Sequence, residues 1–250
     1  MARPSGKTTS GGVRIADDFR DNIIIDRYDP VFIGMRATKT KHLRSENSED
    51  AVTWNVFRSL RQIDPAIWLP VFTRLALDPE HDLPSKDVLV LLWPPVVPPP
   101  GLLEEGDEHA SEIDVVIEGP SWAWFIEAKY RSDIATRTTA RPGRDQVLRN
   151  IDVGSYYAGV RDFYFSLLLR DEATSPLGAA AVAQYKNLSA PRHRLAEHRP
   201  DGLANLRAVG LMTWGMLAKV LRECEATATR PGERHFAEQA RAWLEGKGLG

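Results

Sequence analysis

Two apolar segments, over residues 112–118 and 124–130, carry charged side chains at regular intervals. Each reads as a β-strand, and the Gly-Pro-Ser sequence between them predicts a turn that joins the two strands into a hairpin. Because side chains alternate between the faces of a strand, Glu127 and Lys129 lie on one face of the second strand. We expect Asp114, on the first strand, to reach the same place. Charged groups in apolar strands are costly to bury unless they are paired or bound to a metal.

The rest of the pattern predicts an alternation of helices and strands. Apolar residues at helical spacing indicate helices, and alternating or continuous apolar runs indicate strands. We expect helices over residues 48–60, 66–77 (interrupted at Pro70), 145–156, 178–186, 215–226 and 232–244, and strands over 88–93, 112–118, 124–130, 162–169 and 208–214. Residues 23–25 and 31–33 fit short strands or loop segments. The order predicts an α/β domain with a central mixed sheet flanked by helices, followed by extra C-terminal helices.

The first of these helices has a clear start. Ser45 or Ser48 would cap it, and Glu49 and Asp50 fill its first turn, where the helix dipole favours acidic side chains. Glu46 competes with Glu49 as an acid near the helix start, but it precedes the expected cap. Glu49 is therefore the better candidate for an acid that projects from this helix.

Length and composition set wider limits. The 250 residues suit one large domain or a domain with an appendage, and the small, polar, Gly-rich residues 1–12 predict a disordered arm. There is no apolar run near the roughly 18 residues that a membrane span needs, and the first residues lack the apolar core of a signal peptide, so we expect a cytoplasmic protein. The one cysteine, Cys224, excludes an internal disulfide, a cysteine-rich zinc ribbon and a four-cysteine iron–sulfur cluster.

Charge is unevenly distributed, although the formal net charge is only −2. Residues 101–118 hold seven acidic side chains and no Lys or Arg, whereas residues 129–149 are mainly basic. The first block could hold a cation and the second could hold phosphates. Two oppositely charged, solvated loops would have the same composition. The histidines show no metal-ligand spacing, and neither a phosphate-binding loop nor a known DNA-reading motif is visible.

The predicted order of elements and the charged residues together resemble the PD-(D/E)xK nuclease superfamily, which has the restriction-endonuclease-like fold. Asp114 and the run Glu127-Ala128-Lys129 carry the resemblance. Glu49 resembles the acid that many members place beside the metal, and Gln146 resembles a polar residue that several branches keep early in the next helix.

The sequence departs from the family pattern at two positions. Ile113 precedes Asp114 where a proline is common, and Asn150 stands where some branches carry an aromatic residue. The resemblance places the nuclease core at residues 45–170, which leaves an N-terminal extension at 13–44 and a C-terminal α/β extension at 171–250, packed on the core.

The residue types suggest a site for a divalent cation. Asp114, Glu127 and Glu49, with the carbonyl oxygen of Ala128, would supply the oxygen ligands that Mg²⁺ prefers, and Mn²⁺ would substitute. Lys129 beside such a cation should have a lowered pKa and could orient or deprotonate the attacking water. Two alternatives remain open at this point. Glu112 or Glu118 could be a ligand instead, and Glu127 and Lys129 could be a structural pair on an edge strand.

The basic block supplies candidates for binding nucleic acid. The predicted contacts are Arg131, Arg137, Arg141, Arg144, Gln146 and Arg149. We therefore expect a Mg²⁺-dependent deoxyribonuclease, most simply a DNA endonuclease. The resemblance is shared by the genome-defence, mobile-element and repair branches of the family, and the sequence does not choose among them. A homodimer would suit cleavage of both strands, and a partner protein could supply specificity. A catalytically silent nucleic-acid-binding or assembly module with the same fold, and a hydrolase of another phosphoester, are the alternatives.

Overall fold

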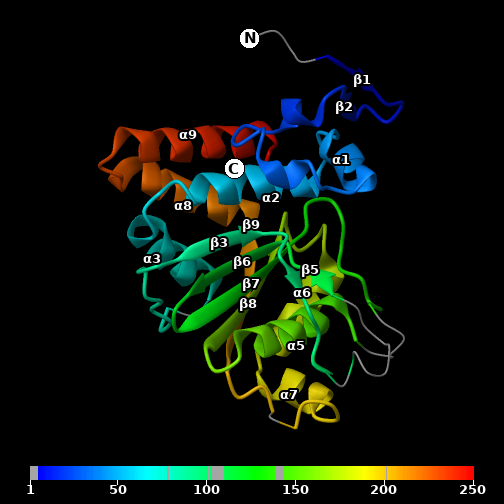
Figure 1. Ribbon diagram of the computed structural model, residues 1–250, viewed down its shortest axis with the longest axis vertical. Helices are drawn as coiled ribbons and strands as arrows, with labels where there is room; N and C mark the ends of the chain where they lie inside the picture. Colours follow the sequence, from blue (N-terminus) through cyan, green and yellow to red (C-terminus); the bar gives the residue numbers. More distant parts are fainter. Residues whose placement is uncertain (1–4, 78, 101, 103–109, 139–143, 201) are drawn as a thin grey trace.

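The structure is a computed structural model that describes residues 5–77, 79–100, 102, 110–138, 144–200 and 202–250. A five-stranded mixed sheet runs through its centre, with helices on both faces (Figure 1). In spatial order the strands are β3 (Leu89–Leu92), β6 (Val115–Gly119), β7 (Trp122–Ala128), β8 (Asp162–Leu169) and β9 (Leu206–Thr213). β3, β6 and β7 are antiparallel neighbours, whereas β7, β8 and β9 run parallel. The prediction of an α/β domain with a mixed sheet flanked by helices is confirmed.

The predicted hairpin is formed by β6 and β7. Val115 pairs with Ile126 and Gly119 pairs with Trp122, so the turn consists of Pro120 and Ser121. Side chains alternate between the two faces of β7, and Glu127 lies near the C-terminal end of this strand.

The first predicted strand of this hairpin is not continuous. Ser111–Glu112 form a separate strand, β5, which pairs with β4 (Pro95–Val96). Asp114 lies in the break and turns its carboxylate toward β7, where Oδ2 accepts a hydrogen bond from the N–H of Ala128. Because of the break, the backbone N–H of Ala128 at the end of β7 is bound by the Asp114 side chain and not by a backbone carbonyl of a neighbouring strand.

Helix α5 (Gln146–Ala158) connects β7 to β8 and covers one face of the sheet. Its N-cap is Asp145, whose Oδ1 accepts from the N–H of Leu148 over 2.9 Å. Gly154 allows the close approach, because a Cβ atom there would lie 2.1 Å from Cζ of Phe163 on β8. The same face carries α6 (Pro176–Tyr185) and α7 (Ser189–Leu195). The polar, Arg-rich sequence of α7 did not predict a helix.

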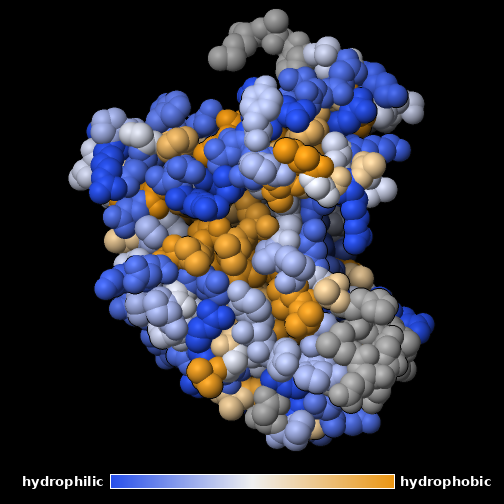
Figure 2. Space-filling model, viewed as in Figure 1, coloured by the Kyte–Doolittle hydropathy of each residue, from blue (hydrophilic) through white to orange (hydrophobic). Residues whose placement is uncertain are grey.

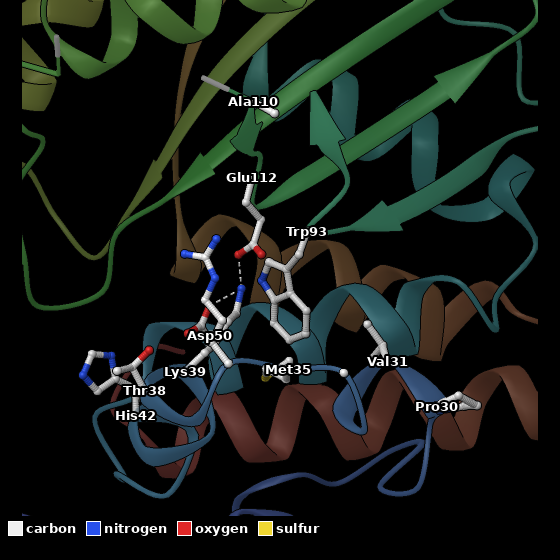
Figure 3. A pocket seen from close by; sticks show the side chains of 12 residues that line it. Pro30, Val31, Met35, Thr38, Lys39, His42, Asp50, Trp93, Ala110 and Glu112 are labelled. Atoms are coloured by element: carbon white, nitrogen blue, oxygen red, sulfur yellow. Dashed lines mark hydrogen bonds and ion pairs between the residues drawn. The ribbon is translucent and has the colours of Figure 1, made fainter. Parts of the chain in front are cut away.

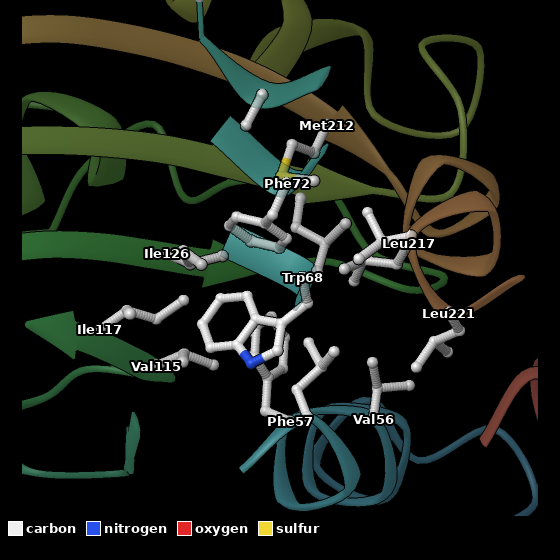
Figure 4. Close-up of a cluster of buried hydrophobic side chains, with 14 of the residues drawn as sticks. Val56, Phe57, Trp68, Phe72, Val115, Ile117, Ile126, Met212, Leu217 and Leu221 are labelled. Carbon is white, nitrogen blue, oxygen red and sulfur yellow. The ribbon is translucent and has the colours of Figure 1, made fainter. Parts of the chain in front are cut away.

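The opposite face is covered by α2 (Glu49–Leu60), α3 (Pro65–Ala76) and α8 (Trp214–Thr227), and α9 (Pro231–Gly246) packs on α2 and α8 on the side away from the sheet (Figure 1). Figure 4 shows their apolar side chains, with Trp68 and Phe72 of α3 facing Ile126 of β7. α3 is continuous through Pro70, although the sequence predicted an interruption there. As the sixth residue of α3, Pro70 has no N–H to donate, so the carbonyl of Ala66 lacks its intrahelical hydrogen bond while the helix continues.

The C-terminal third belongs to the same sheet. β9 pairs with β8 in parallel along most of its length, from Phe163–Leu206 to Leu169–Thr213. The predicted boundary at residue 170 therefore falls between two adjacent strands, and residues 171–250 complete the sheet rather than only packing on it.

Apolar side chains of the N-terminal extension, among them Phe19 and Phe32, pack against Trp54 of α2 in a cluster separate from those on the two sheet faces. β1 (Gly6–Thr8) pairs with β2 (Arg14–Ala16), so residues 6–8 are ordered as a strand, contrary to the predicted disordered arm. Short 3₁₀ turns, η1 (Phe19–Asn22) and η2 (Pro30–Phe32), precede α1 (Ala37–Leu43), and the strands considered at 23–25 and 31–33 do not form.

Apolar side chains also reach the surface. On the face seen in Figure 2, they gather in the middle of the molecule, over β3, and Leu89 of this strand is among the exposed large hydrophobic residues. None of the described helices combines the length and the apolar character that crossing a membrane requires.

Candidate active site

Glu127 and Lys129 lie at the C-terminal end of β7, inside the sheet. Lys129 Nζ donates to Glu127 Oε1 over 2.7 Å, as the alternation of faces predicted. Only 5% of Glu127 and 7% of Lys129 are exposed. The alternative of a solvent-facing pair on an edge strand is wrong, because β7 has β6 on one side and β8 on the other.

Two amide side chains of α5 hold the Glu127 carboxylate from the other side. Gln146 Nε2 donates to Oε1 over 2.5 Å, and Asn150 Nδ2 donates to Oε2 over 2.7 Å. Residues four apart share a face of a helix, so both amides point toward β7. Gln146, which we predicted to contact nucleic acid, is thus placed on the carboxylate. Asn150 was not predicted as a site residue, and its spacing from Gln146 was the available signal.

Asp114 approaches from the break before β6. Its Oδ2 accepts from the N–H of Ala128 over 2.8 Å, which fixes the carboxylate beside the end of β7. Among the residues that the structure describes, Oδ1 accepts no hydrogen bond. The structure therefore brings the predicted ligands Asp114 and Ala128 together and leaves one carboxylate oxygen of Asp114 available.

Glu49 reaches the same place from the start of α2. Its Oε2 accepts from the N–H of Tyr130 over 2.7 Å and from the hydroxyl of Ser132 over 3.1 Å. Its Oε1 lies 3.6 Å from Lys129 Nζ. The helix acid predicted from the sequence is therefore part of the site, bound to the segment that follows β7.

The start of α2 explains why Glu49 and not Glu46 takes this role. Ser48 is the N-cap, because its hydroxyl accepts from the N–H of Ala51 over 3.1 Å. Glu46 precedes the cap and accepts instead from the backbone N–H of Arg14 over 2.7 Å.

The acids of the site hold more negative charge than the single amine can neutralise. Burial raises the pKa of Asp114 well above its usual range, and Glu127 and Glu49 add to this rise. Burial also raises the pKa of Glu49, against the opposing effect of Lys129. In both acids burial is the larger cause of the raised pKa and the neighbouring carboxylates are a smaller one.

The pKa of Lys129 moves in the direction opposite to the one we predicted. Burial alone would lower this pKa, but Glu127, Glu49 and Asp114 together raise it above its usual range. The predicted lowering requires a bound cation, whereas the carboxylates alone hold the amine in its charged form.

The fit of this cluster to a metal ion can be judged from its donors. Within the described ranges, no group of three or more His, Cys, Asp or Glu side chains is arranged to hold a metal ion. The excess negative charge, the oxygen donors and the available oxygen of Asp114 nevertheless suit Mg²⁺, which binds few carboxylates and keeps several waters. The residues therefore suit Mg²⁺ by charge and donor type, and Asp114 holds the carboxylate oxygen that accepts no hydrogen bond from the described residues.

The alternative ligands lie elsewhere. Glu112 contacts Lys39 of α1. Glu118 accepts from Arg161 over 2.8 Å and from the hydroxyl of Tyr157 over 3.0 Å. Both acids have other partners, so neither replaces Asp114. The other acids of the predicted acidic block, at 104–108, lie outside the described residues.

The predicted phosphate-binding arginines have different surroundings. Arg131 and Arg137 are exposed, and the Arg131 guanidinium lies 5.3 Å from the ring centre of Tyr130. Arg149 is half-buried on α5, and Arg141 lies outside the described residues. Of these predicted arginines, Arg131 is the one closest in sequence to Glu127 and Lys129.

Arg144 is buried, and the prediction that it contacts nucleic acid is wrong. Its Nη2 lies 2.8 Å from Oδ2 of Asp152, and only 3% of the residue is exposed. Arg199 and His198 each lie 2.8 Å from the same carboxylate. The carboxylate of Asp152, which lies in α5 beyond the basic block of residues 129–149, draws this guanidinium into the interior.

A cavity of about 510 Å³ opens beside Glu49. It lies between the start of α2 and the segment after β7, and Arg131 and Ser132 line its other side. Glu49 is the member of the acid cluster that lines this cavity.

Comparison of the chain with protein-family models, with curated proteins and with solved structures finds no match.

Proposed function

We propose that the protein is a metal-dependent nuclease, most simply a cytoplasmic DNA endonuclease with a restriction-endonuclease-like core. The observation that carries the proposal is that Glu127 and Glu49 both lie at Lys129 at the end of a central strand, while Asp114 accepts from the neighbouring N–H of Ala128. Burying three carboxylates with a single amine is costly in free energy, because one positive charge cannot neutralise all three, and this cost favours a functional role over a purely structural one.

Mg²⁺ or Mn²⁺ bound at Asp114, with Glu127, Glu49 and the Ala128 carbonyl as the other candidate ligands, would acidify a water and offset the charge of a phosphodiester. Lys129 supplies a fixed positive charge for a phosphate oxygen, since Glu127 and Glu49 keep it charged and in place. Gln146 and Asn150 stop the Glu127 carboxylate from rotating.

Nucleic acid would approach along the cavity beside Glu49. Arg131 lines this cavity, and the exposed Arg137 follows it in sequence, so both suit contacts with phosphates. One such site addresses one strand at a time. A homodimer, or a partner protein that adds specificity, would therefore serve double-strand cleavage.

The test is a cleavage assay on linear and circular duplex DNA, single-stranded DNA and RNA, with Mg²⁺, Mn²⁺ or EDTA. Wild type is compared with Lys129→Ala, and Lys219→Ala, an exposed lysine of α8, is the matched control. We expect metal-dependent cleavage by wild type and by the control, and its loss in Lys129→Ala with nucleic-acid binding retained.

Other outcomes would lead to other functions. Tight binding of nucleic acid without cleavage under any condition would favour the silent module. Cleavage of equal rate in Lys129→Ala would contradict the proposed site. The circular substrate separates an endonuclease from an exonuclease, and the panel as a whole separates DNA from RNA.

A further inference from the structure

A second cavity, of about 670 Å³, adjoins the first. It lies between α1 and Trp93, and the two cavities share His42 and Asp50 in their linings. Figure 3 shows Val31, Met35 and Trp93 around it, with Lys39 reaching from α1 to Glu112. Asp114, Glu127, Lys129 and Glu49 do not line this cavity, so the proposed cleavage site does not account for it.

The charges that line this cavity nearly cancel. Lys39 contacts Glu112, and its Nζ lies 3.4 Å from Oδ1 of Asp50. Arg36 and His42 are the other basic side chains in the lining. A phosphate-binding site has a surplus of positive charge. A lining of balanced charges with an apolar wall suits a neutral ring that both donates and accepts hydrogen bonds.

Trp93 has an unsatisfied donor at this cavity. Only 6% of the residue is exposed, and among the described residues its buried Nε1 has no hydrogen-bond partner. Its φ of +56° is a strained value for a tryptophan. Trp54 stacks on the ring at 5.2 Å, and Lys39 Nζ lies 4.0 Å from the ring centre, so the N–H edge and not the ring face is left for a ligand.

We propose that this cavity binds an unpaired nucleobase of the substrate strand, a base with an exocyclic amine such as adenine. The Trp93 N–H would donate to a ring nitrogen, Asp50 or Glu112 would accept from the amine, and Val31 and Met35 would pack against the ring. The Trp93 N–H is buried, so a bound base has to displace a neighbouring side chain to reach it, and the Glu112 side chain, which is 52% exposed, can move.

This inference rests on the proposed nuclease function and narrows its substrate. The base would occupy the cavity next to the one beside Glu49 while its phosphate lies at the acid cluster. A base in that position cannot be paired. The substrate is therefore single-stranded at the cut, either as a single strand or as an opened end or junction of a duplex.

Methionine-methyl NMR tests the site directly, because the chain has only four methionines and Met35 alone lines this cavity among the described residues. The probes are deoxyadenosine 5′-monophosphate, thymidine 5′-monophosphate and 2-deoxyribose 5-phosphate. Met35→Leu assigns the signal, and the buried Met212 is the internal control. We expect a saturable shift of Met35 with the adenine nucleotide, weaker binding of the thymine nucleotide, and no shift with the sugar phosphate.

Two substitutions check the residues involved. Trp93→Phe keeps a ring but removes the N–H, and should weaken adenine nucleotide binding about tenfold, the effect of one lost hydrogen bond. Glu112→Ala, at an exposed position, should also weaken it. Trp243→Phe on α9 is the matched control and should bind as wild type. An equal Met35 shift with the sugar phosphate, no Met35 shift at high ligand excess, or wild-type affinity in both variants would overturn the proposal.

Failure of this inference is distinguishable from failure of the proposed function. Cleavage that depends on Lys129, without any Met35 response, would remove the nucleobase site and leave the nuclease. A base-dependent Met35 response without cleavage would support the nucleobase site and contradict the nuclease.

Discussion

Glu127 is the most constrained side chain of the candidate active site. Its two oxygens accept from Lys129, Gln146 and Asn150, at distances between 2.5 and 2.7 Å. Burial would raise the pKa of an isolated carboxylate, which would then become protonated. Here an amine and two amides stabilise it, which keeps the carboxylate in one orientation beside Asp114.

We predict that Gln146→Ala lowers the free energy of unfolding by about 1–3 kcal/mol, because it removes a donor from a buried carboxylate. Gln184→Ala, at an exposed position of α6, is the control and should change stability by less than about 0.5 kcal/mol. Urea unfolding measures both. Equal stability of the two variants would mean that the amide contact contributes nothing.

Asp152 makes stability depend on pH. Burial alone would raise its pKa, but the hydrogen bond from His198 and the guanidinium groups of Arg144 and Arg199 lower it below its usual range. Such a carboxylate stabilises the fold above its unfolded-state pKa of about 3.9, and this stabilisation is lost as the pH falls through the lower folded-state pKa.

We therefore predict that Asp152→Asn costs about 3–5 kcal/mol at pH 7, because two buried guanidinium groups lose their carboxylate. The difference from wild type should shrink as the pH falls below about 4. The control is Asp162→Asn, whose partner Arg207 is exposed, and it should cost no more than about 1 kcal/mol. Urea unfolding over a pH series measures all three proteins, and a difference that stays constant with pH would contradict this assignment.

At the scale of elements, strands and helices with a regular apolar period could be predicted. β8 has the predicted bounds of 162–169, and Asp145 caps α5 near the predicted start. The break at Asp114 could not be predicted, because it depends on a hydrogen bond to a strand that follows in sequence. α7 was missed because its polar residues have no clear period, although Pro191 and Leu195 are buried.

In the candidate active site too, residues in segments with a regular apolar pattern could be predicted, and residues placed by contacts between distant parts of the chain could not. Glu49, Asp114, Glu127 and Lys129 could be placed together, because the segments 48–60, 112–118 and 124–130 that hold them have a regular pattern of apolar and polar residues. Arg144 could not be placed, because its position depends on Asp152, which only the three-dimensional structure shows to be buried.

The packing of α5 on the sheet gives a prediction at this scale. Gly154→Ala places a Cβ within 2.1 Å of Phe163 and 2.9 Å of Phe125, so we expect a loss of about 1–3 kcal/mol in stability. Gly246→Ala in α9, where a Cβ meets nothing within 4 Å, should be neutral or slightly stabilising. Thermal unfolding compares the two, and a neutral Gly154→Ala would show that α5 can move away from β8.

At the scale of the whole molecule, the C-terminal third is part of the site's support. Trp214, the first residue of α8, donates from Nε1 to the carbonyl of Lys129 over 3.0 Å. α8 also covers the sheet face on which Trp124 of β7 is buried, and α9 packs behind α8.

A chain that ends at residue 170 should therefore fail to fold, because it loses β9 and the helices that cover this face. Circular dichroism during heating measures the outcome. We expect no cooperative transition for the shortened chain. A sharp transition like that of the full chain would show that residues 45–170 form an independent core.

The claim on which the account depends is that the acid cluster binds a divalent cation. Calorimetric titration with Mn²⁺ tests it, comparing wild type with Asp114→Ala and with Asp82→Ala, an exposed acid remote from the cluster in sequence. We predict saturable binding to wild type and to Asp82→Ala, and its loss in Asp114→Ala, because Asp114 holds the available carboxylate oxygen. Absence of binding to wild type, or equal binding to Asp114→Ala, would contradict the account.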